Sequence, residues 1–472
     1  KIDGTGRPLI HKSGKGHARD YFVATDGSVL AREAFDDSEN IHNVSAFHGQ
    51  KAIEIYSQET PYMTKDFIGV SLDEKHLIMV DSNRDTNREA IYTVALQDGK
   101  IEGPLYEKEN ADIVRPITDW QRKVLGIQYS GFYPSYTFFD ADLEQRVQAI
   151  LGSFPKHSVW IIDVSPDRKQ VLVQVEGSQS AGDYFLFSKD KEPNFISSLR
   201  PNIPANEIHP IGTVTFKARD GLKIPTVITI PRGKLDDMKN LPTVVLPHGG
   251  PASFDSIGFD YQAQALAEQG YLVLQPNFRG SKGFGDKHEV AGYGEWGRKS
   301  LDDLTDAVDY FSKRGMVDRD RVCIVGSSYG GYAALAGGAF TPDVYKCVVS
   351  INGLGNLADM LDRTQYERGE NSSALAFWQA QILGFGETDE DVAKLRSPEF
   401  SAELFKAPVL LIHSEKDSVV HPRQSITMYR ALKNADKQVD KIELEGEDHN
   451  LSHGPTRVKA LKAMVEFVNK HI

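Results

Sequence analysis

The stretch Arg321-Val322-Cys323-Ile324-Val325-Gly326-Ser327-Ser328-Tyr329-Gly330 decides how the second half of this chain folds. The apolar run over 321–325 is typical of a buried strand, and a helical pattern containing Ala333-Ala334-Leu335 follows the glycines. Glycines two residues to either side of Ser328 would let the strand and the helix pack closely and expose the serine hydroxyl at a sharp turn. This context predicts that Ser328 is a nucleophile. The alternative is an ordinary serine in a glycine-rich turn.

Similar apolar runs recur on both sides of this turn. They cover residues 243–246, 271–274, 322–325, 347–350 and 409–412. Helical patterns at 298–314, 329–339 and 422–434 lie between them, and two strands flank the Asp220-Gly221 turn near the start. Continuous apolar strands that alternate with helices are typical of a parallel sheet covered on both faces. Residues 206–472 are therefore predicted to form an α/β domain with a mainly parallel sheet.

The first part of the chain, residues 1–205, follows a different pattern. Short strand-like runs are separated by polar turns, and no convincing helix is expected. A polar turn before an apolar pair recurs ahead of Leu30, Leu77, Val124 and Val171, each 47 residues after the one before. A period in the forties with several strands per repeat is typical of propeller blades. We expect an all-β propeller-type domain of about four blades, incomplete because a closed ring of four is unusual. The alternative is a turn-rich β domain in which the equal steps arise by chance.

Composition limits the partners of the chain. It has 54 basic and 66 acidic residues, a formal net charge of −12, and the basic residues are scattered. Nucleic acid and anionic membranes attract a basic footprint, so neither is expected as a partner. No apolar run approaches the length of a membrane span. The composition is that of a soluble globular protein.

Two further expectations come from the cysteines and the first residue. Cys323 and Cys347 both lie in apolar runs, and we expect them to be buried and unpaired thiols. The sequence starts at Lys1, so it is expected to be a processed or partial product. Its compartment is expected to be the cytoplasm, with the periplasm or secretion as the alternatives.

A serine hydroxyl needs a base and an orienting acid to become a nucleophile. In α/β-hydrolases these partners follow the serine in the order acid, then histidine. The run 409–412 leads into a loop that contains Glu415 and Asp417, at the end of a parallel strand where α/β sites lie. Asp417 is the predicted acid, and Glu415 is the alternative.

The predicted base is His449. It follows the run 441–444 in the loop Glu445-Gly446-Glu447-Asp448-His449, ahead of a last helix. His453 is the alternative, four residues later. His413 and His421, near the acid loop, are expected to be structural.

The attack on a carbonyl creates an oxyanion that needs two N–H donors. The residue after the nucleophile, Tyr329, supplies one in this fold. Gly250, in the loop Leu246-Pro247-His248-Gly249-Gly250-Pro251, is the predicted second donor, because glycines let a backbone approach the substrate closely. A structural turn is the alternative.

Other ligand motifs are absent from the sequence. The glycines of 277–285 match neither a dinucleotide fingerprint nor a phosphate-binding loop, and this stretch is expected to shape the rim of the active site. No spacing of histidine, cysteine and aspartate suggests a metal site. We expect no cofactor and no metal.

As a set, these motifs resemble the prolyl oligopeptidase family of serine peptidases, nearest its acylaminoacyl-peptidase and bacterial dipeptidyl-peptidase-like branch. The resemblance is carried by Leu246 to Pro251, by Asn277-Phe278-Arg279-Gly280-Ser281 through Gly285, by Gly326 to Tyr332 and by Glu445 to His449. It implies an α/β-hydrolase domain preceded by a β-propeller. It also implies a triad of Ser328, Asp417 and His449, with the Gly250 and Tyr329 backbone groups as the oxyanion hole.

The resemblance further implies hydrolysis of short peptides, because a propeller over the site excludes folded proteins. Two features depart from the family pattern: about four blades are expected where seven are usual, and no Glu-Glu pair occurs, although such a pair anchors the free amino terminus in the dipeptidyl-peptidase branch. The acyl-side pocket is expected to be apolar, with Tyr332, Phe377 and Trp378 as candidate walls; these three are equally consistent with core aromatics. A homo-oligomer is the remaining partner expectation.

Two other functions are consistent with the sequence. A carboxylesterase would use the same triad, although such enzymes carry small helical caps instead of a propeller. A non-catalytic scaffold would require a decayed site, whereas all the triad positions here are filled.

Overall fold

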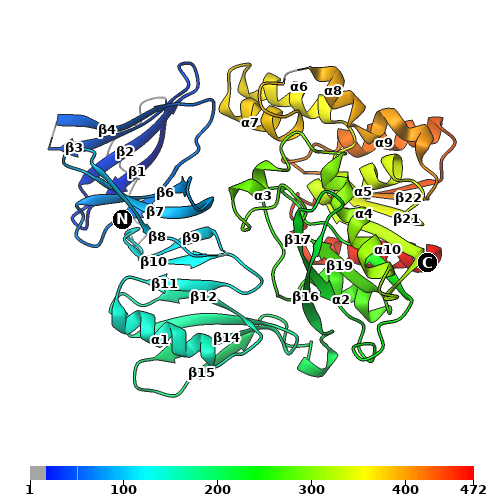
Figure 1. Ribbon diagram of the computed structural model, residues 1–472, viewed down its shortest axis with the longest axis horizontal. Coiled ribbons are helices and arrows are strands. Elements are labelled where there is room, and N and C mark those ends of the chain that lie inside the picture. The colour runs from blue at the N-terminus through cyan, green and yellow to red at the C-terminus, as the bar shows by residue number, and fades with distance from the viewer. Residues whose placement is uncertain (1–16, 50, 110, 388) are drawn as a thin grey trace.

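The computed structural model describes residues 17–49, 51–109, 111–387 and 389–472. The chain forms two parts that lie side by side (Figure 1). Four small β-sheets make up the first part, and the second part is a large sheet covered by helices. The predicted fold class, an α/β-hydrolase domain preceded by a propeller-type domain, is confirmed.

Each small sheet is built from strands that are consecutive in the chain and antiparallel. The strands are β1 (Ala18–Val23), β2 (Val29–Asp36), β3 (Ile41–His48) and β4 (Lys51–Glu59) in the first sheet; β5 (Asp66–Val70), β6 (His76–Asn83), β7 (Arg88–Ala95) and β8 (Ile101–Tyr106) in the second; β9 (Ile113–Thr118), β10 (Val124–Tyr129) and β11 (Ser135–Phe138) in the third; and β12 (Ser158–Val164), β13 (Gln170–Gly177), β14 (Ser180–Ser188) and β15 (Asn194–Ser198) in the fourth.

The 47-residue period has a direct structural counterpart. Leu30, Leu77, Val124 and Val171 all lie in the second strand of their sheets, namely β2, β6, β10 and β13. Apolar side chains of neighbouring sheets share common cores, as blades of a propeller do. The repeat therefore marks one strand of each blade.

The third blade differs from the others because a helix follows its three strands. Helix α1 (Ala141–Gly152) begins at Asp140, whose side chain accepts a hydrogen bond from the N–H of Leu143. Leu143, Val147 and Ile150 recur at helical spacing and are buried between the third and fourth blades. The expectation that residues 1–205 contain no helix was wrong, because a single amphipathic segment is hard to see among many short strands.

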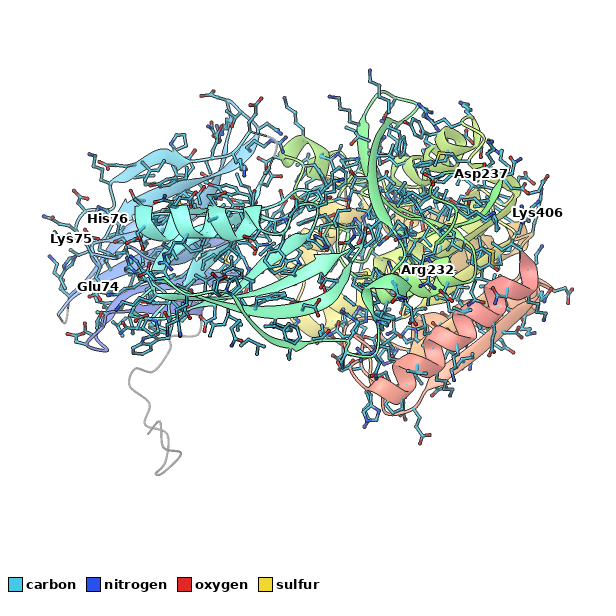
Figure 2. All side chains as sticks on the ribbon, turned by 90° about the horizontal axis from the view of Figure 1, so that it is seen from below. Glu74, Lys75, His76, Arg232, Asp237 and Lys406 are labelled. Carbon is cyan, nitrogen blue, oxygen red and sulfur yellow. A yellow bond between two sulfur atoms is a disulfide. The ribbon has the colours of Figure 1, made fainter. Side chains whose placement is uncertain are left out.

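Polar turns join the first three blades at the end far from the α/β part. The Glu74 carboxylate accepts a hydrogen bond of 2.9 Å from the Thr25 N–H and pairs with Lys123 Nζ at 2.8 Å. These three residues come from the repeating turns of three successive blades. Figure 2 shows Glu74 at the opposite end of the molecule from Lys406 of the α/β part.

The α/β part contains an eight-stranded sheet and nine α-helices within the described residues. Its strands are β16 (Ile211–Lys217), β17 (Lys223–Thr229), β18 (Leu241–Val245), β19 (Leu272–Pro276), β20 (Val317–Ser327), β21 (Cys347–Ile351), β22 (Val409–Ser414) and β23 (Val439–Leu444). Its helices are α2 (Tyr261–Glu268), α3 (Asp286–Val290), α4 (Lys299–Ser312), α5 (Tyr329–Phe340), α6 (Leu357–Arg368), α7 (Ser373–Ile382), α8 (Glu390–Leu395), α9 (Arg423–Asn434) and α10 (Gly454–His471), with short 3-10 helices at Ala205–Glu207 and Pro398–Leu404.

The strand order is β16-β17-β19-β18-β20-β21-β22-β23. β16 and β17 form an antiparallel hairpin, β17 is antiparallel to β19, and the remaining neighbours are parallel. Apolar residues of α4, α5 and α9 form a core with one face of the sheet, whereas α2 and α10 contribute to a second core on the other. The parallel strands are thus buried on both faces, as their continuous apolar sequences indicate.

Cys323 and Cys347 form a disulfide bond, with a distance of 2.04 Å between the sulfur atoms. The prediction that both side chains are buried was correct, because neither is exposed. The prediction that they are unpaired was wrong. They stand opposite each other on the adjacent parallel strands β20 and β21. The sequence gives no indication of this register, because α5 lies between the two strands.

One contact between the two parts of the molecule is the loop that contains Gly283 and Gly285. Asp112 Oδ2 accepts a hydrogen bond of 2.5 Å from the Gly285 N–H, and the Ser130 hydroxyl donates to Gly283 O at 2.8 Å. On the other side of the interface, the Ser158 hydroxyl donates to Ile257 O. These contacts fix the propeller against loops that border the candidate site.

Within the described residues, no helix has the length and apolar character needed to cross a membrane.

Candidate active site

Ser328 occupies a strained turn between β20 and α5. Its backbone angles are φ 58° and ψ −121°, in a region that a residue with a side chain rarely adopts. The flanking glycines explain how the turn fits. A Cβ on Gly326 would lie 2.2 Å from Gly330 O, and a Cβ on Gly330 would lie 2.1 Å from Pro247 O. Only glycine at both positions permits this approach of strand, helix and the preceding loop.

The structure brings Ser328, His449 and Asp417 together in the predicted order. His449 Nε2 lies 3.1 Å from Ser328 Oγ, and His449 Nδ1 lies 2.7 Å from Asp417 Oδ2. Because a carboxylate only accepts, Nδ1–H donates to Asp417 and Nε2 is left to accept the serine proton. This geometry equips the serine with a base whose tautomer is fixed.

The Asp417 carboxylate is held on its other side by backbone groups. Its Oδ1 accepts hydrogen bonds of 2.8 Å from the N–H groups of both Val419 and Val420, and the residue is only 4% exposed. The alternative acid, Glu415, is turned away from the histidine and accepts from the Gly446 N–H at 2.7 Å. The alternative base, His453, stands at the start of α10. The predicted members of each pair are the ones that meet at the site.

Asn352 is a supporting residue that the sequence did not reveal. It follows β21 with φ 49°, and its side-chain amide donates to His449 O at 3.0 Å and accepts from the Ser414 N–H at 2.8 Å. This amide therefore ties the histidine loop to the end of β22. Its only sequence signal is its position directly after an apolar run.

His413 holds the loop that carries Asp417 through hydrogen bonds. Its Nε2–H donates to Val420 O at 2.9 Å, and its Nδ1 lies 2.5 Å from the Ser425 hydroxyl. Burial lowers the pKa of His413. The structural role predicted for this histidine agrees with these contacts.

Gly250 and Tyr329 line one cavity together with Ser328. Neither backbone N–H has an acceptor in the described part of the chain. Two free donors beside a serine hydroxyl are what the oxyanion of acyl transfer requires. Both predicted donors thus belong to residues that line the cavity of the nucleophile.

The cavity beside Ser328 has a volume of about 370 Å³. Its apolar walls are Trp296, Leu354, Met360 and Trp378, and its polar rim includes Arg363, Glu367, Arg368 and His421. Helix α6 supplies most of the rim. Of these residues, sequence reasoning named only Trp378 as a wall of this cavity. It missed the others because they come from segments far apart in the chain and belong to no motif.

The three aromatic residues proposed for the cavity wall have different positions. Trp378 lines the cavity. Tyr332 is 1% exposed and lies in the core, where its hydroxyl donates to Arg396 O at 2.9 Å. Phe377 packs edge-on against Tyr62 of the propeller. Placing Tyr332 and Phe377 in the wall was wrong, because α5 and α7 direct them to other neighbours.

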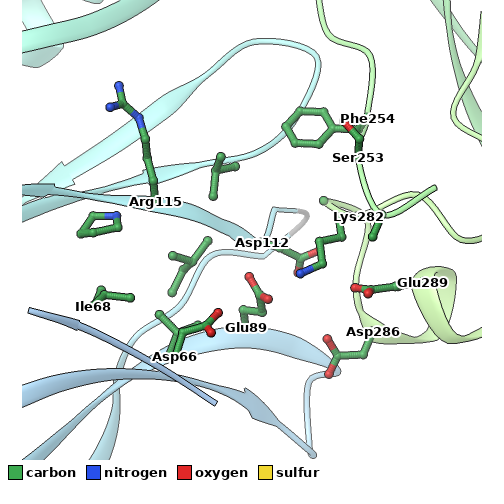
Figure 3. Close-up of a pocket in the computed structure, with 16 residues that line it drawn as sticks. Asp66, Ile68, Glu89, Asp112, Arg115, Ser253, Phe254, Lys282, Asp286 and Glu289 are labelled. Carbon is green, nitrogen blue, oxygen red and sulfur yellow. The ribbon is translucent and has the colours of Figure 1, made fainter. Parts of the chain in front are cut away.

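A second cavity, of about 310 Å³, lies between the two parts of the molecule (Figure 3). Its carboxylates come from the propeller and from helix α3: Asp66, Glu89, Asp112, Asp286 and Glu289. The ammonium of Lys282 lies among them, and Arg88 lies 3.5 Å from Asp112. Burial raises the pKa of Glu89 to about 8 and also raises that of Asp112 and Glu289. Too little positive charge compensates these carboxyls.

No group of three or more His, Cys, Asp and Glu side chains suited to a metal ion occurs among the described residues.

A mainly parallel sheet, a strained serine between strand and helix, and an acid and a histidine on later loops define the α/β-hydrolase class of serine hydrolases. Residues 257–472 match the model of the prolyl oligopeptidase family. This part of the chain therefore belongs to the prolyl oligopeptidase family, and the resemblance seen in the motifs is confirmed.

Curated relatives extend the similarity into the propeller. Dipeptidyl aminopeptidase BIII of Pseudoxanthomonas mexicana is 31% identical over 419 residues, which cover 84% of this chain and 58% of that protein. The acylamino-acid-releasing enzyme of Rattus norvegicus is 27% identical over 411 residues, or 75% of this chain and 54% of that protein. The chain thus spans somewhat more than half the length of these relatives.

Solved structures share the fold. A puromycin-hydrolyzing peptidase of Mycobacterium tuberculosis superimposes with a TM-score of 0.77 at 19% identity, covering 97% of this chain and 70% of that one. An acylaminoacyl peptidase in complex with Z-Gly-Gly-Phe-chloromethyl ketone gives a TM-score of 0.71, also at 19% identity, covering 93% of this chain and 68% of that one.

Proposed function

We propose that this chain is a serine peptidase that hydrolyses short peptides through an acyl-enzyme. Ser328 Oγ attacks the scissile carbonyl while His449 takes its proton, and the oxyanion accepts hydrogen bonds from the Gly250 and Tyr329 N–H groups. His449 then protonates the leaving amine, and water releases the acyl group by the same steps. Asp417 keeps the imidazole in the required tautomer.

A single observation carries this proposal. The hydrogen-bonded series Ser328 Oγ, His449 Nε2, His449 Nδ1 and Asp417 Oδ2, with distances of 3.1 and 2.7 Å, ends in a cavity that two free N–H donors also border. Membership of residues 257–472 in a peptidase family supports peptides as the substrate class.

The test compares substrates and a matched variant. We expect the protein to hydrolyse short peptide anilides and to bind a fluorophosphonate label that Ser328→Ala abolishes. Ser327→Ala, at the preceding residue, should keep the label. Hydrolysis of p-nitrophenyl esters with no amide cleavage would instead identify a carboxylesterase, and no labelling at all would identify a non-catalytic scaffold.

The cavity walls support an apolar residue on the acyl side of the scissile bond. Trp296, Leu354, Met360 and Trp378 enclose a volume suited to a large apolar side chain. A series of anilides that differ only in this residue should give higher kcat/KM for Phe, Leu or Met than for Asp or Lys. Trp378→Ala should reduce this preference, whereas Tyr332→Phe, in the core, should keep it.

The interdomain cavity supports a substrate with a free amino terminus. Lys282 and Arg88 supply less positive charge than its five carboxyls could balance, and a peptide ammonium would add to it. The cavity is lined by Ala252, Ser253 and Phe254, which closely follow Gly250 in the chain, so it borders the other side of the oxyanion loop. A relative at 31% identity is named a dipeptidyl aminopeptidase. The paired glutamates absent from the sequence would thus be replaced by carboxyls that only the fold brings together.

Free and blocked peptides of the same sequence test this part of the proposal. Glu89→Gln should raise KM for the free amine and leave KM for the N-acetyl peptide unchanged. Glu74→Gln makes the same chemical change at the far end of the propeller (Figure 2) and should affect neither substrate. Equal KM values for free and blocked peptides in the unaltered protein would contradict it.

The compartment and the association state stay predictions. The disulfide between Cys323 and Cys347 favours an oxidising compartment over the cytoplasm, since cytosolic disulfides are rare.

A further inference from the structure

His248 precedes the two glycines of the oxyanion loop, and within the described residues its ring is hydrogen-bonded to Gly249 and Ser281 and not to the triad. Its Nδ1 lies 2.7 Å from Gly249 O, and its Nε2 lies 2.8 Å from Ser281 Oγ. A carbonyl oxygen only accepts, so Nδ1 carries the proton and donates to Gly249 O. Burial lowers the pKa of His248 to about 4, and the ring is neutral at physiological pH. Nε2 therefore accepts a hydrogen bond from the Ser281 hydroxyl.

The carbonyl of Gly249 and the N–H of Gly250 belong to one peptide group. In a planar trans peptide the C=O and the N–H point in opposite directions. A hydrogen bond that fixes the direction of Gly249 O therefore also fixes the direction of the Gly250 N–H. Gly250 lines the cavity beside Ser328, and its N–H is the predicted oxyanion donor. Glycine allows a peptide plane to rotate more freely than other residues do, so this loop needs an external restraint.

The restraint is itself rigidly held. The His248 ring stacks on Phe278, with 4.5 Å between centroids, and Phe278 stacks in turn on Tyr329 at 5.2 Å. Ser281 is fully buried, and its N–H donates to Phe278 O. One aromatic ring thus lies between the residue that orients the first oxyanion donor and the residue that supplies the second.

The loop that carries Phe278 and Ser281 is anchored by Arg279. This guanidinium makes hydrogen bonds of 2.8–2.9 Å to Asp303 and of 2.7–3.1 Å to Asp220, and both Arg279 and Asp303 are buried. Because this anchor is buried and hydrogen-bonded, Ser281 presents its hydroxyl to the imidazole from a fixed position.

We propose that His248 is a positioning residue that directs the Gly250 N–H at the oxyanion through its hydrogen bond to Gly249 O, and that Ser281 selects the tautomer which makes this possible. The inference rests on the proposed acyl-transfer function. It predicts that His248 acts on the transition state and leaves substrate binding unchanged.

Four variants separate this role from a structural one. His248→Asn places an amide N–H close to the position of Nδ1 and should retain most of the activity. His248→Gln extends its amide toward the position of Nε2, and His248→Phe keeps only the ring. Both should lower kcat for a peptide anilide by about 10- to 100-fold, somewhat less than the loss of a whole oxyanion donor, with KM changed less than about 2-fold. Ser281→Ala should lower kcat by about 2- to 10-fold, the effect of one hydrogen bond. His209→Phe, a buried histidine outside the site, is the matched control and should keep kcat.

Inhibitor binding provides a second measurement. The affinity of a peptidyl trifluoromethyl ketone, which forms an oxyanion on Ser328, should fall across the variants in proportion to kcat/KM. The affinity of the cleaved peptide acid should stay constant. Thermal unfolding midpoints show which variants fold. If a His248 variant does not fold, Ser281→Ala still tests the inference.

Two results would overturn the inference: activity in His248→Phe or His248→Gln equal to that in His248→Asn, or a loss that appears in KM alone. If the unaltered protein neither cleaves peptides nor binds the ketone, the proposed function fails instead, and the two failures are distinguishable.

Discussion

At the scale of single residues, the acid of the triad offers the sharpest test, because the sequence places two carboxylates two residues apart. Asp417→Asn should lower kcat about 10⁴-fold, the loss typical of this change in other triads, since an amide can no longer hold the His449 Nδ1–H tautomer. The measurement is steady-state hydrolysis of a peptide anilide.

Glu415→Gln is the matched control for Asp417. Its carboxylate accepts from the Gly446 N–H and does not meet the histidine, so kcat should remain within about 2-fold of the unaltered protein, as for other exposed surface positions. If the two variants lost activity equally, the assignment of the acid would be wrong.

The pairing of Cys323 and Cys347 is a second prediction at this scale. A thiol reagent added to the denatured but unreduced protein should find no free thiol, and prior reduction should release two. The strand register that pairs them depends on how β21 returns beside β20 after α5. Two free thiols without reduction would contradict the disulfide.

At the scale of elements, the turn between β20 and α5 requires the backbone at Gly330 to lie close to the backbone at Pro247. Gly330→Ala would place a Cβ 2.1 Å from Pro247 O, so we expect it to lower the free energy of unfolding by about 1–3 kcal/mol and to reduce activity strongly. Gly152→Ala, at the end of α1, meets nothing within 4 Å and should stabilise the protein by about 0.5–1 kcal/mol. Thermal and denaturant unfolding measure both. Equal effects at the two positions would show that close packing does not require Gly330.

Whether a feature is local in the chain explains whether the sequence could predict it. The strand, turn and helix around Ser328, the two loops that carry Asp417 and His449, and the blade repeat are local patterns, and short-range sterics and periodicity determine them. The walls of the active-site cavity are different. Trp296 and Met360 come from separate segments, and no local rule brings them together. The helix α1 is local too, but it interrupts a repeating β pattern.

At the scale of the whole molecule, the interface between propeller and α/β part gathers carboxyl groups whose pKa values are raised by burial. Glu89, Asp112 and Glu289 meet there only because the two parts pack together (Figure 3). No sequence pattern could reveal this set, since its members are separated by up to 200 residues. The interface thus couples the titration of these carboxyls to the stability of the folded protein.

Glu89 makes this coupling measurable through pH. Its pKa is raised from 4.5 to about 8 by burial, so between these values the folded protein retains a proton that the unfolded chain has lost. Stability should therefore fall as pH rises from about 4.5 to 8, with a total penalty on the order of 2–4 kcal/mol once residual exposure is allowed for. Glu89→Gln removes this titration. Its thermal unfolding midpoint should exceed that of the unaltered protein at pH 8.5, with a smaller difference at pH 5.

Glu74→Gln should change the stability in the opposite direction to Glu89→Gln. Hydrogen bonds from Lys123 and Thr25 lower the pKa of Glu74 to about 2, so its contribution to stability is present above about pH 4.5 and is lost as pH falls toward 2. Because the pair is near the surface, the variant should lose only about 0.5–1 kcal/mol at neutral pH. Its midpoint should then lie below that of the unaltered protein at pH 7 and approach it in acid.

A Glu89→Gln midpoint that follows the unaltered protein from pH 5 to 8.5 would show that the interdomain carboxyl does not hold its proton in the folded state.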